Sequence, residues 1–248
     1  MTLEVLGVIP ARLASTRMPR KVLREIAGRP MIYHVYVRAR RCSLLADLLV
    51  ATDSDEVVSA CHTYGIPAIL TSPDHPSGTD RVWEIAQGRA ADVYVNIQGD
   101  EPLITPGHIE RLVRPFRERP GTQVSTLKIR ATPEEEPNPS VNKVVCDVEG
   151  RALYFSKHPI PYDRDGRSVA RFKHIGVYAY TRAALDAYHH LPPSPLELTE
   201  RLEQLRFLEH GIPIVVVETD EPTIGVDTEE ELRAVQARFS SRAGRPPM

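Results

Sequence analysis

The sequence predicts an α/β protein, in which a mostly parallel, twisted sheet is covered by helices in three layers. Short apolar runs alternate with helix-like segments in the first half of the chain, and such repeats imply right-handed crossovers between parallel strands. The 248 residues are enough to bury a large core. Polar side chains follow the apolar runs directly, at the ends of strands where parallel sheets bind ligands.

The elements expected in the first half follow the apolar periodicity. Strands are expected at residues 5–9, 47–51, 67–70 and 93–97, and helices at 31–42, 79–90 and 106–119. Another helix is expected between Ser54 and Gly65, because Asp53 or Ser54 can cap its first turn and glycine commonly ends a helix.

Strands dominate after Gln123. They are expected at residues 124–129, 143–148, 152–155 and 173–180, with a turn from Asp147 to Gly150. Helices are expected at 182–190, 195–210 and 228–239, with a last strand at 212–218. We therefore expect one domain over residues 1–240, a β-rich insertion at about 130–180, and a frayed tail at 241–248.

The composition excludes several classes of protein. Lys and Arg total 31 and Asp and Glu total 33, without the basic excess typical of nucleic-acid binders. Three scattered cysteines without a C-x-x-C motif indicate free thiols in a reducing cytosol. We see neither an apolar leader nor a run of ~18 apolar residues. We expect a cytoplasmic protein that binds small molecules, and neither nucleic acid nor membrane.

The loop between Val8 and Val22 is the strongest local signal. It follows the first strand and concentrates cations and hydroxyls: Arg12, Ser15, Thr16, Arg17, Arg20 and Lys21. Crowded cations repel one another, and a bound triphosphate would remove that cost. Arginine forks match phosphate oxygens, and lysine supplies a compact charge. A solvated basic turn is the alternative interpretation.

Two acidic residues follow apolar strands. Asp100 lies in N-I-Q-G-D-E-P and Asp227 in G-V-D-T. Mg²⁺ prefers one or two carboxylates together with substrate phosphates and water. The alternatives are a turn residue for Asp100 and a helix N-cap for Asp227. Together with the basic loop, the two acids favour a metal-dependent nucleotidyl-transfer site.

A third segment, Ser77-Gly78-Thr79, forms a donor-rich turn into a helix, where glycine lets a flat ligand approach. A plain helix cap is the alternative. The Rossmann dinucleotide and P-loop fingerprints are absent. Three classes stay open: a nucleotidyltransferase, a non-catalytic nucleotide-binding module and a glycosyltransferase. The two acids favour the first.

Longer motifs connect these segments, among them I-P-A-R-L-A-S-T-R-M-P-R-K, H-P-S-G-T-D-R, V-N-I-Q-G-D-E-P, H-I-G-V-Y and G-V-D-T. Together they resemble the 3-deoxy-manno-octulosonate cytidylyltransferases, or CMP-Kdo synthetases, from residue 8 to about 239. The resemblance implies a Rossmann-like nucleotidyltransferase fold that converts CTP and 3-deoxy-D-manno-octulosonate (Kdo) into CMP-Kdo and diphosphate for lipopolysaccharide biosynthesis. It also implies Mg²⁺ and a homodimer that contacts through the β-rich insertion.

The resemblance assigns residues to each role. The nucleotide would be bound by Pro10, Ala11, Arg12, Ser15, Arg17, Lys21, Thr52, Asp53, Ser77, Gly78, Thr79, Arg81 and Gln98. The sugar acid would be surrounded by Gln98, Lys157, His174, Tyr178, Glu203 and Gln204. Lys21, Asp100 and Arg17 would be catalytic, and the Mg²⁺ ligands would be Asp100 and Asp227.

The chain departs from the family pattern at two of these positions. Lys157 stands where the family usually has Arg, and lysine grips a carboxylate through a single point. Other acid sugars, such as 8-amino-Kdo or a sialic-acid-like sugar, therefore stay open as substrates. Arg20 replaces a usual Gly in the basic loop.

Overall fold

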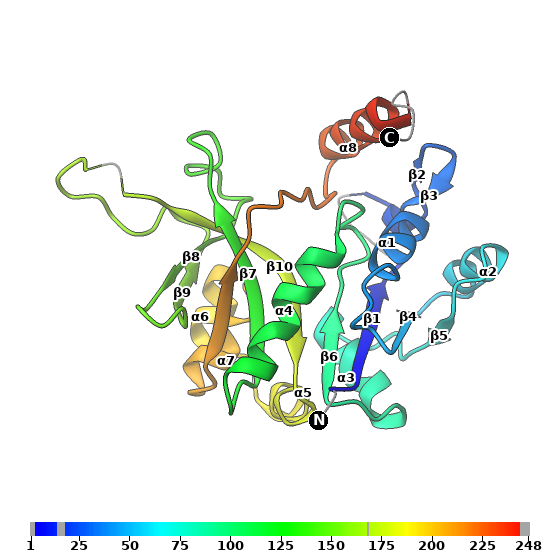
Figure 1. Ribbon diagram of the computed structural model, residues 1–248, viewed down its shortest axis with the longest axis horizontal. Coiled ribbons are helices and arrows are strands. Elements are labelled where there is room, and N and C mark those ends of the chain that lie inside the picture. Colours follow the sequence, from blue (N-terminus) through cyan, green and yellow to red (C-terminus); the bar gives the residue numbers. More distant parts are fainter. Residues whose placement is uncertain (1–2, 14–17, 168, 244–248) are drawn as a thin grey trace. The chain divides into compact units, whose positions relative to one another are not determined.

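The computed structural model describes residues 3–13, 18–167 and 169–243 (Figure 1). The chain divides into two compact units. Unit 1 comprises Met1–Ile109 and Thr223–Met248, and unit 2 comprises Glu110–Pro222. Ser15 and Arg17 of the predicted nucleotide site lie outside the described residues.

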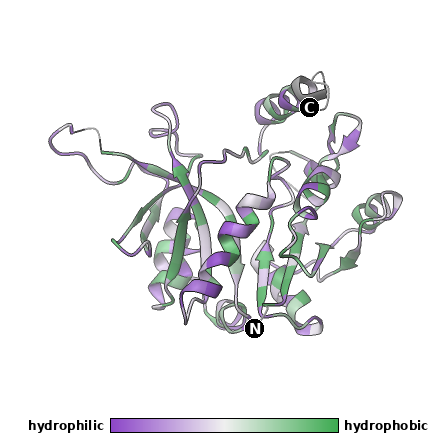
Figure 2. Cartoon of the chain, viewed as in Figure 1, coloured by the Kyte–Doolittle hydropathy of each residue, from purple (hydrophilic) through white to green (hydrophobic). Residues whose placement is uncertain are grey.

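Unit 1 is built on parallel strands in the order β6-β1-β4-β5. Their bounds are Val5–Ala11 for β1, Asp47–Thr52 for β4, Ala68–Leu70 for β5 and Val93–Asn96 for β6. β1 is buried along its whole length, as expected for a parallel strand that is covered on both faces. Figure 2 shows apolar residues concentrated in the strands, whereas the helices alternate between apolar and polar residues.

Unit 1 also contains several helices. They are α1 (Met31–Ala39), α2 (Asp55–Thr63), α3 (Gly78–Gly88) and α8 (Glu229–Ala243), while α4 (Pro106–Glu118) crosses the boundary into unit 2. The short 3₁₀ helix η1 (Lys21–Leu23) and the pair β2 (Glu25–Ile26) and β3 (Arg29–Pro30) follow the basic loop and were not predicted. Ser54 caps α2 as expected, since its side chain accepts a hydrogen bond from the backbone N–H of Val57 at 3.4 Å.

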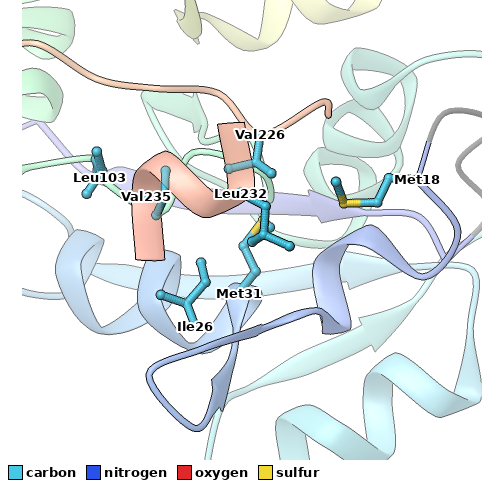
Figure 3. Packing of buried hydrophobic residues seen from close by; sticks show 7 residues of the cluster. All are labelled: Met18, Ile26, Met31, Leu103, Val226, Leu232 and Val235. Carbon is cyan, nitrogen blue, oxygen red and sulfur yellow. The ribbon is translucent and has the colours of Figure 1, made fainter. Parts of the chain in front are cut away.

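A hydrophobic cluster joins α8 to the segments around the basic loop (Figure 3). Its buried members are Met18, Ile26, Met31, Leu103, Val226, Leu232 and Val235. Met18 lies in the basic loop, three residues before Lys21, and Val226 directly precedes Asp227. Each fully buried aliphatic side chain of this kind stabilises by about 1.5–3 kcal/mol. The same core therefore anchors the segments that carry Lys21 and Asp227.

Unit 2 contains mixed strand pairs. Its strands are β7 (Val124–Arg130), β8 (Lys143–Cys146), β9 (Ala152–Ser156), β10 (Phe172–Tyr180) and β11 (Ile214–Glu218). β7 pairs with β11 in parallel and with β10 antiparallel, and the β8–β9 hairpin extends from β10. The register of β10 against β7 shifts between Ile175 and Tyr178, which marks a bulge. The helices are α5 (Arg182–His190), α6 (Pro195–Glu200) and α7 (Leu205–Glu209).

The predicted α/β class with a mostly parallel sheet is confirmed. The turn at Asp147 to Gly150 is also confirmed, because Gly150 adopts a φ of 79° and its N–H donates to the Asp147 carbonyl at 3.1 Å. The single helix predicted at 195–210 is wrong. Arg201 adopts a left-handed conformation with a φ of 54° and ends α6, so Glu203 and Gln204 lie in the break before α7. The one-domain interpretation, the tail, and the dimerisation role of the insertion stay predictions.

Candidate active site

Three turns of unit 1 converge on Pro10, at the carboxyl end of β1. A Cβ atom on Gly99 would lie 2.8 Å from the Pro10 carbonyl oxygen, a distance that no side chain tolerates. A Cβ atom on Gly78 would lie 3.5 Å from the Pro10 Cβ and 4.0 Å from the Gln98 Oε1. Ala11 is in register with Thr52 at the end of β4. The structure therefore brings Pro10, Ala11, Thr52, Gly78 and Gln98 to one edge of the sheet, as the sequence predicted.

Lys21 joins the two predicted metal ligands. Its Nζ donates to Asp100 Oδ2 at 2.5 Å and to Asp227 Oδ1 at 2.8 Å. Burial lowers the pKa of Lys21, but the charges and hydrogen bonds of Asp100 and Asp227 outweigh this effect, so that its pKa lies above the usual value. The side chain is therefore an ammonium held between two carboxylates.

Glu101 helps to place Asp227 beside Asp100. Its carboxylate is buried and accepts a hydrogen bond from the Thr223 hydroxyl at 2.5 Å. A Cβ atom on Gly225 would lie 3.0 Å from Glu101 Oε1, so the chain passes close to this side chain. The Val226 N–H donates to the Asp100 carbonyl at 2.9 Å. Sequence reasoning missed Glu101, although its place beside Asp100 in G-D-E-P was a usable signal.

The helix-cap interpretation of Asp227 is wrong. Thr228 caps α8, because its hydroxyl accepts from the Glu231 N–H at 3.3 Å while the Glu231 carboxylate accepts from the Thr228 N–H at 2.9 Å. The Asp227 carboxylate pairs with Lys21 instead.

The two carboxylates suit a divalent cation. Both reach the same ammonium, so their oxygens converge on one point. Mg²⁺ takes one or two carboxylates and leaves its other positions to substrate phosphates and water. Within the described part of the chain, no group of three or more His, Cys, Asp or Glu residues could hold a metal ion. Asp100 and Asp227 match in number the one or two carboxylates that Mg²⁺ takes from a protein.

Arg81 is a fully buried cation near the ends of β4 and β5. Its Nη2 pairs with Asp53 Oδ2 at 2.9 Å, and its Nη1 contacts the Thr71 hydroxyl and the Ser72 carbonyl. Burial lowers the pKa of Arg81, Asp53 opposes this, and the nearby charge of Arg12 lowers it further. Its Nε is buried without a hydrogen-bond partner among the described residues. Arg12 and Arg81 are thus brought close to each other.

The polar residues beside Arg81 have structural partners. Ser77 is the N-cap of α3: its oxygen accepts from the Asp80 N–H at 3.1 Å, and its hydroxyl donates to Asp80 Oδ2 at 2.6 Å. The cap interpretation of Ser77 is confirmed, and its contact with a base stays a prediction. Thr79 is fully buried. Gln98 donates to Asn96 Oδ1 at 3.2 Å.

Arg20 adopts a left-handed backbone conformation with a φ of 57°. Glycine adopts this conformation freely, whereas other residues lose about 1–2 kcal/mol in it. The glycine that the resemblance leads us to expect at this position would adopt the conformation without this cost. The Arg20 guanidinium pairs with the exposed Glu56.

In unit 2, three predicted sugar-binding residues lie together. The ring centroids of His174 and Tyr178 are 5.4 Å apart, and Glu203 Oε2 accepts from the Tyr188 hydroxyl at 3.1 Å. Burial raises the pKa of Tyr178, and the charge of Glu203 raises it further. Gln204 is 3% exposed, and its Nε2 is buried without a partner among the described residues.

Both the N–H and the carbonyl of Lys157 are hydrogen-bonded by side chains. Its N–H donates to Glu200 Oε2 at 3.0 Å, and its carbonyl accepts from Lys143 Nζ at 2.7 Å. Lys143 is fully buried and also donates to the carbonyls of Asn138 and Val141, at 2.8 and 2.6 Å. The sequence reasoning missed both Lys143 and Glu200, because no motif marks a lysine that donates only to backbone carbonyls.

The parallel strands of unit 1, with cations and carboxylates after their carboxyl ends, are typical of the class of α/β proteins that bind a ligand at this edge of the sheet. A family model described as cytidylyltransferase matches residues 6–224. The chain belongs to this cytidylyltransferase family.

Proteins similar in sequence to this chain carry names that agree with this family. A protein of Acidobacterium capsulatum named 3-deoxy-manno-octulosonate cytidylyltransferase is 56% identical over 97% of this chain and 98% of its own length. A protein of Koribacter versatilis with the same name is 54% identical over 97% of this chain and 92% of its own length.

Solved structures agree in fold. The structure of a CMP:2-keto-3-deoxy-manno-octonic acid synthetase complexed with CTP has a TM-score of 0.92 at 43% identity, covering 96% of this chain and 99% of that chain. A cytidylyltransferase from Leptospira borgpetersenii has a TM-score of 0.63 at 16% identity, covering 96% and 87%, and this likeness concerns the fold alone.

Proposed function

We propose that this chain transfers a cytidylyl group from CTP to Kdo and releases diphosphate. The observation that carries the proposal is the contact of Lys21 with both Asp100 and Asp227, which lies 206 residues away from Lys21. A nucleotide-binding module without chemistry has little need for such an arrangement. The family of the chain and the names of its relatives support the same reaction.

The residues of unit 1 bind and orient the nucleotide. Arg12 and Lys21, with Ser15 and Arg17 from the basic loop, hold the triphosphate through charge-assisted hydrogen bonds. Lys21 and Arg17 stabilise the charge that develops on the departing diphosphate. The turn after Pro10 and the Ser77–Thr79 turn, with Arg81 fixed by Asp53, receive the cytidine.

Asp100 and Asp227 are the residues that would hold Mg²⁺. When bound, Mg²⁺ screens the phosphate charges and lowers the pKa of a coordinated hydroxyl group. The Lys21 ammonium lies between the two carboxylates here, and with the cation bound it would be available to pair with the phosphates.

The residues of unit 2 bind the sugar acid. Lys157 would bind its carboxylate, and Glu200 and Lys143 fix the Lys157 backbone. His174, Tyr178, Glu203 and Gln204 contact the hydroxyls. The anomeric hydroxyl attacks the α-phosphorus in line, and diphosphate leaves. This displacement requires no covalent intermediate with the chain.

A diphosphate-release screen tests the proposal. CTP, UTP, ATP and GTP are each combined with Kdo, 8-amino-Kdo and a sialic acid in the presence of Mg²⁺. We expect release with CTP and Kdo. If CTP releases diphosphate with another acid sugar but not with Kdo, the choice of Kdo is wrong, and the assignment as a cytidylyltransferase still holds. Lys157 leaves this choice of sugar open. No release with any pair would refute the transferase.

Asp100→Asn tests the site itself. It preserves shape and removes one charge, so we expect turnover to fall at least about 10²-fold, with an unchanged circular dichroism spectrum. Asp220→Asn is the matched control, because the Asp220 side chain is 88% exposed. Wild-type turnover in Asp100→Asn would refute the assignment of this carboxylate.

We further propose that the enzyme works in the cytoplasm as a homodimer and supplies lipopolysaccharide biosynthesis. The cysteines Cys42, Cys61 and Cys146 form no disulfide bond, as is usual for proteins of a reducing compartment. Across the described residues, no helix is both long and apolar enough to cross a lipid bilayer. Light scattering coupled to size exclusion tests the dimer, and a monomeric mass would contradict it.

A further inference from the structure

The imidazole of His174 has one hydrogen-bond partner among the described residues, the hydroxyl of Thr126. His174 Nε2 and Thr126 Oγ1 lie 2.8 Å apart. Phe155 packs edge-on against the ring with a centroid separation of 5.0 Å, and Tyr178 packs at 5.4 Å. Part of the His174 surface stays exposed. The two aromatic neighbours and Thr126 thus fix the plane of the ring.

The Thr126 hydroxyl donates its proton to a backbone carbonyl of β10. Thr126 Oγ1 lies 2.8 Å from the Val177 carbonyl and 3.2 Å from the Ile175 carbonyl. Both carbonyls belong to the bulge of β10, which turns them toward β7. A carbonyl only accepts hydrogen bonds, and a hydroxyl has a single proton. The Thr126 oxygen therefore accepts a hydrogen bond from His174, and the ring donates this bond from Nε2.

The ring is also neutral. Burial lowers the pKa of His174 to about 3, so that at pH 7 it carries one proton only. In a neutral imidazole one nitrogen donates and the other accepts. With the proton on Nε2, the accepting nitrogen is Nδ1.

We propose that Thr126 is a positioning residue that fixes His174 as the Nε2–H tautomer, so that Nδ1 accepts a hydrogen bond from a hydroxyl of the sugar acid. The part that concerns the sugar rests on the proposed function. His174 then recognises a donor and repels a carboxylate, which leaves the sugar carboxylate to Lys157. Binding of the sugar therefore depends on a hydroxyl at the position that faces Nδ1.

Nitrogen NMR of the wild-type protein labelled in histidine tests the tautomer without any substrate. We expect a pyrrole-type signal for Nε2 and a pyridine-type signal for Nδ1 of His174 from pH 6 to 8, assigned by their loss in His174→Gln. A pyrrole-type Nδ1, or an even mixture of tautomers, would overturn the proposal. The result is independent of whether the protein is a transferase.

Three variants test the consequence. Thr126→Val keeps the shape and removes the hydroxyl, so we expect the tautomers to mix and the KM for the sugar to rise about tenfold, with an unchanged KM for CTP. Thr126→Ser keeps a hydroxyl and should restore both readouts. Ser125→Ala is the matched control, because Ser125 is a buried neighbour whose hydroxyl donates to the Leu112 carbonyl at 2.6 Å, away from His174; it should change neither.

Each outcome decides a separate part of the proposal. An unchanged KM for the sugar in Thr126→Val, with mixed tautomers, would overturn the positioning role. A rise in KM that Thr126→Ser fails to reverse would do the same, because it would show that packing and not the hydroxyl matters. A wild-type protein without transferase activity would refute the proposed function and the sugar contact, while the nitrogen signals would still decide the tautomer.

Discussion

If Asp100 and Asp227 hold Mg²⁺ as proposed, the cation would compete with Lys21 for these two carboxylates, and replacing Lys21 by methionine measures this competition. Lys21 Nζ lies 2.5 Å from Asp100 Oδ2 and 2.8 Å from Asp227 Oδ1, so these two oxygens are at most about 5.3 Å apart. At such a distance, and at an effective dielectric constant between about 20 and 80, two unit charges repel by about 1–3 kcal/mol. The side chains of Asp100 and Asp227 are 27% and 39% exposed, so solvent screening favours the lower half of this range.

Without the ammonium, the two carboxylates repel each other until a cation enters. We therefore expect Lys21→Met to bind Mg²⁺ about 5- to 30-fold more tightly than the wild type in the absence of CTP, which corresponds to about 1–2 kcal/mol. Turnover should move in the opposite direction and fall at least about 10²-fold, because Lys21 no longer reaches the phosphates. Isothermal titration with Mg²⁺ measures the first effect, and diphosphate release measures the second.

Lys173→Met is the matched control. The side chains of Lys173 and its partner Glu135 are 18% and 27% exposed, close to the 13% and 27% of Lys21 and Asp100. This variant should leave Mg²⁺ binding and turnover unchanged. Unchanged or weaker Mg²⁺ binding in Lys21→Met would refute the shared use of the two carboxylates.

Three further predictions concern stability. Arg206 donates to the two carboxylate oxygens of Glu197 at 2.6 and 2.8 Å, and Arg206→Met leaves this carboxylate without its buried partner. The free energy of unfolding should fall by about 3–5 kcal/mol in a guanidinium titration. A loss below about 1 kcal/mol would contradict the pairing. Leu232→Ala, at a side chain that is 2% exposed in the core under α8, should cost about 2–5 kcal/mol in the same assay, and a neutral result would place α8 off this core. The folded-state pKa of His174 is lowered from 6.5 to about 3, so the unfolded chain binds the additional proton and stability falls as the pH falls below 6.5. This loss should reach up to about 2 kcal/mol between pH 6.5 and 5, and His174→Phe should flatten it; an equal slope in the variant would contradict the lowered pKa.

The strand ends of unit 1 could be predicted from the sequence. A buried parallel strand reads as a continuous apolar run, and the polar residue that follows it lies at the ligand-binding edge. This rule placed Thr52, Gln98 and Asp100 at the ends of β4 and β6, as the structure does. The sequence also indicated Asp100 and Asp227 as a pair, but the contact of both with Lys21 depends on tertiary packing and was not predicted.

The second half of the chain was harder to predict, because its conformation depends on a few backbone angles and long-range contacts. The left-handed angle of Arg201 breaks the helix expected at 195–210, and no residue type at that position announces it. The bulge between Ile175 and Tyr178 is equally invisible in a strand of alternating residues. Because the sequence does not show the bulge, neither the contacts of Thr126 nor the tautomer of His174 could be inferred from it.

The central claim is that Asp100 and Asp227 together hold the divalent cation of bound CTP. Anomalous scattering from crystals soaked with Mn²⁺ and CTP tests it most directly. We expect an anomalous peak within coordination distance of both carboxylates and of a phosphate oxygen, with Lys21 moved away from Asp100 and Asp227. A peak elsewhere, or one that neither carboxylate reaches, would contradict it.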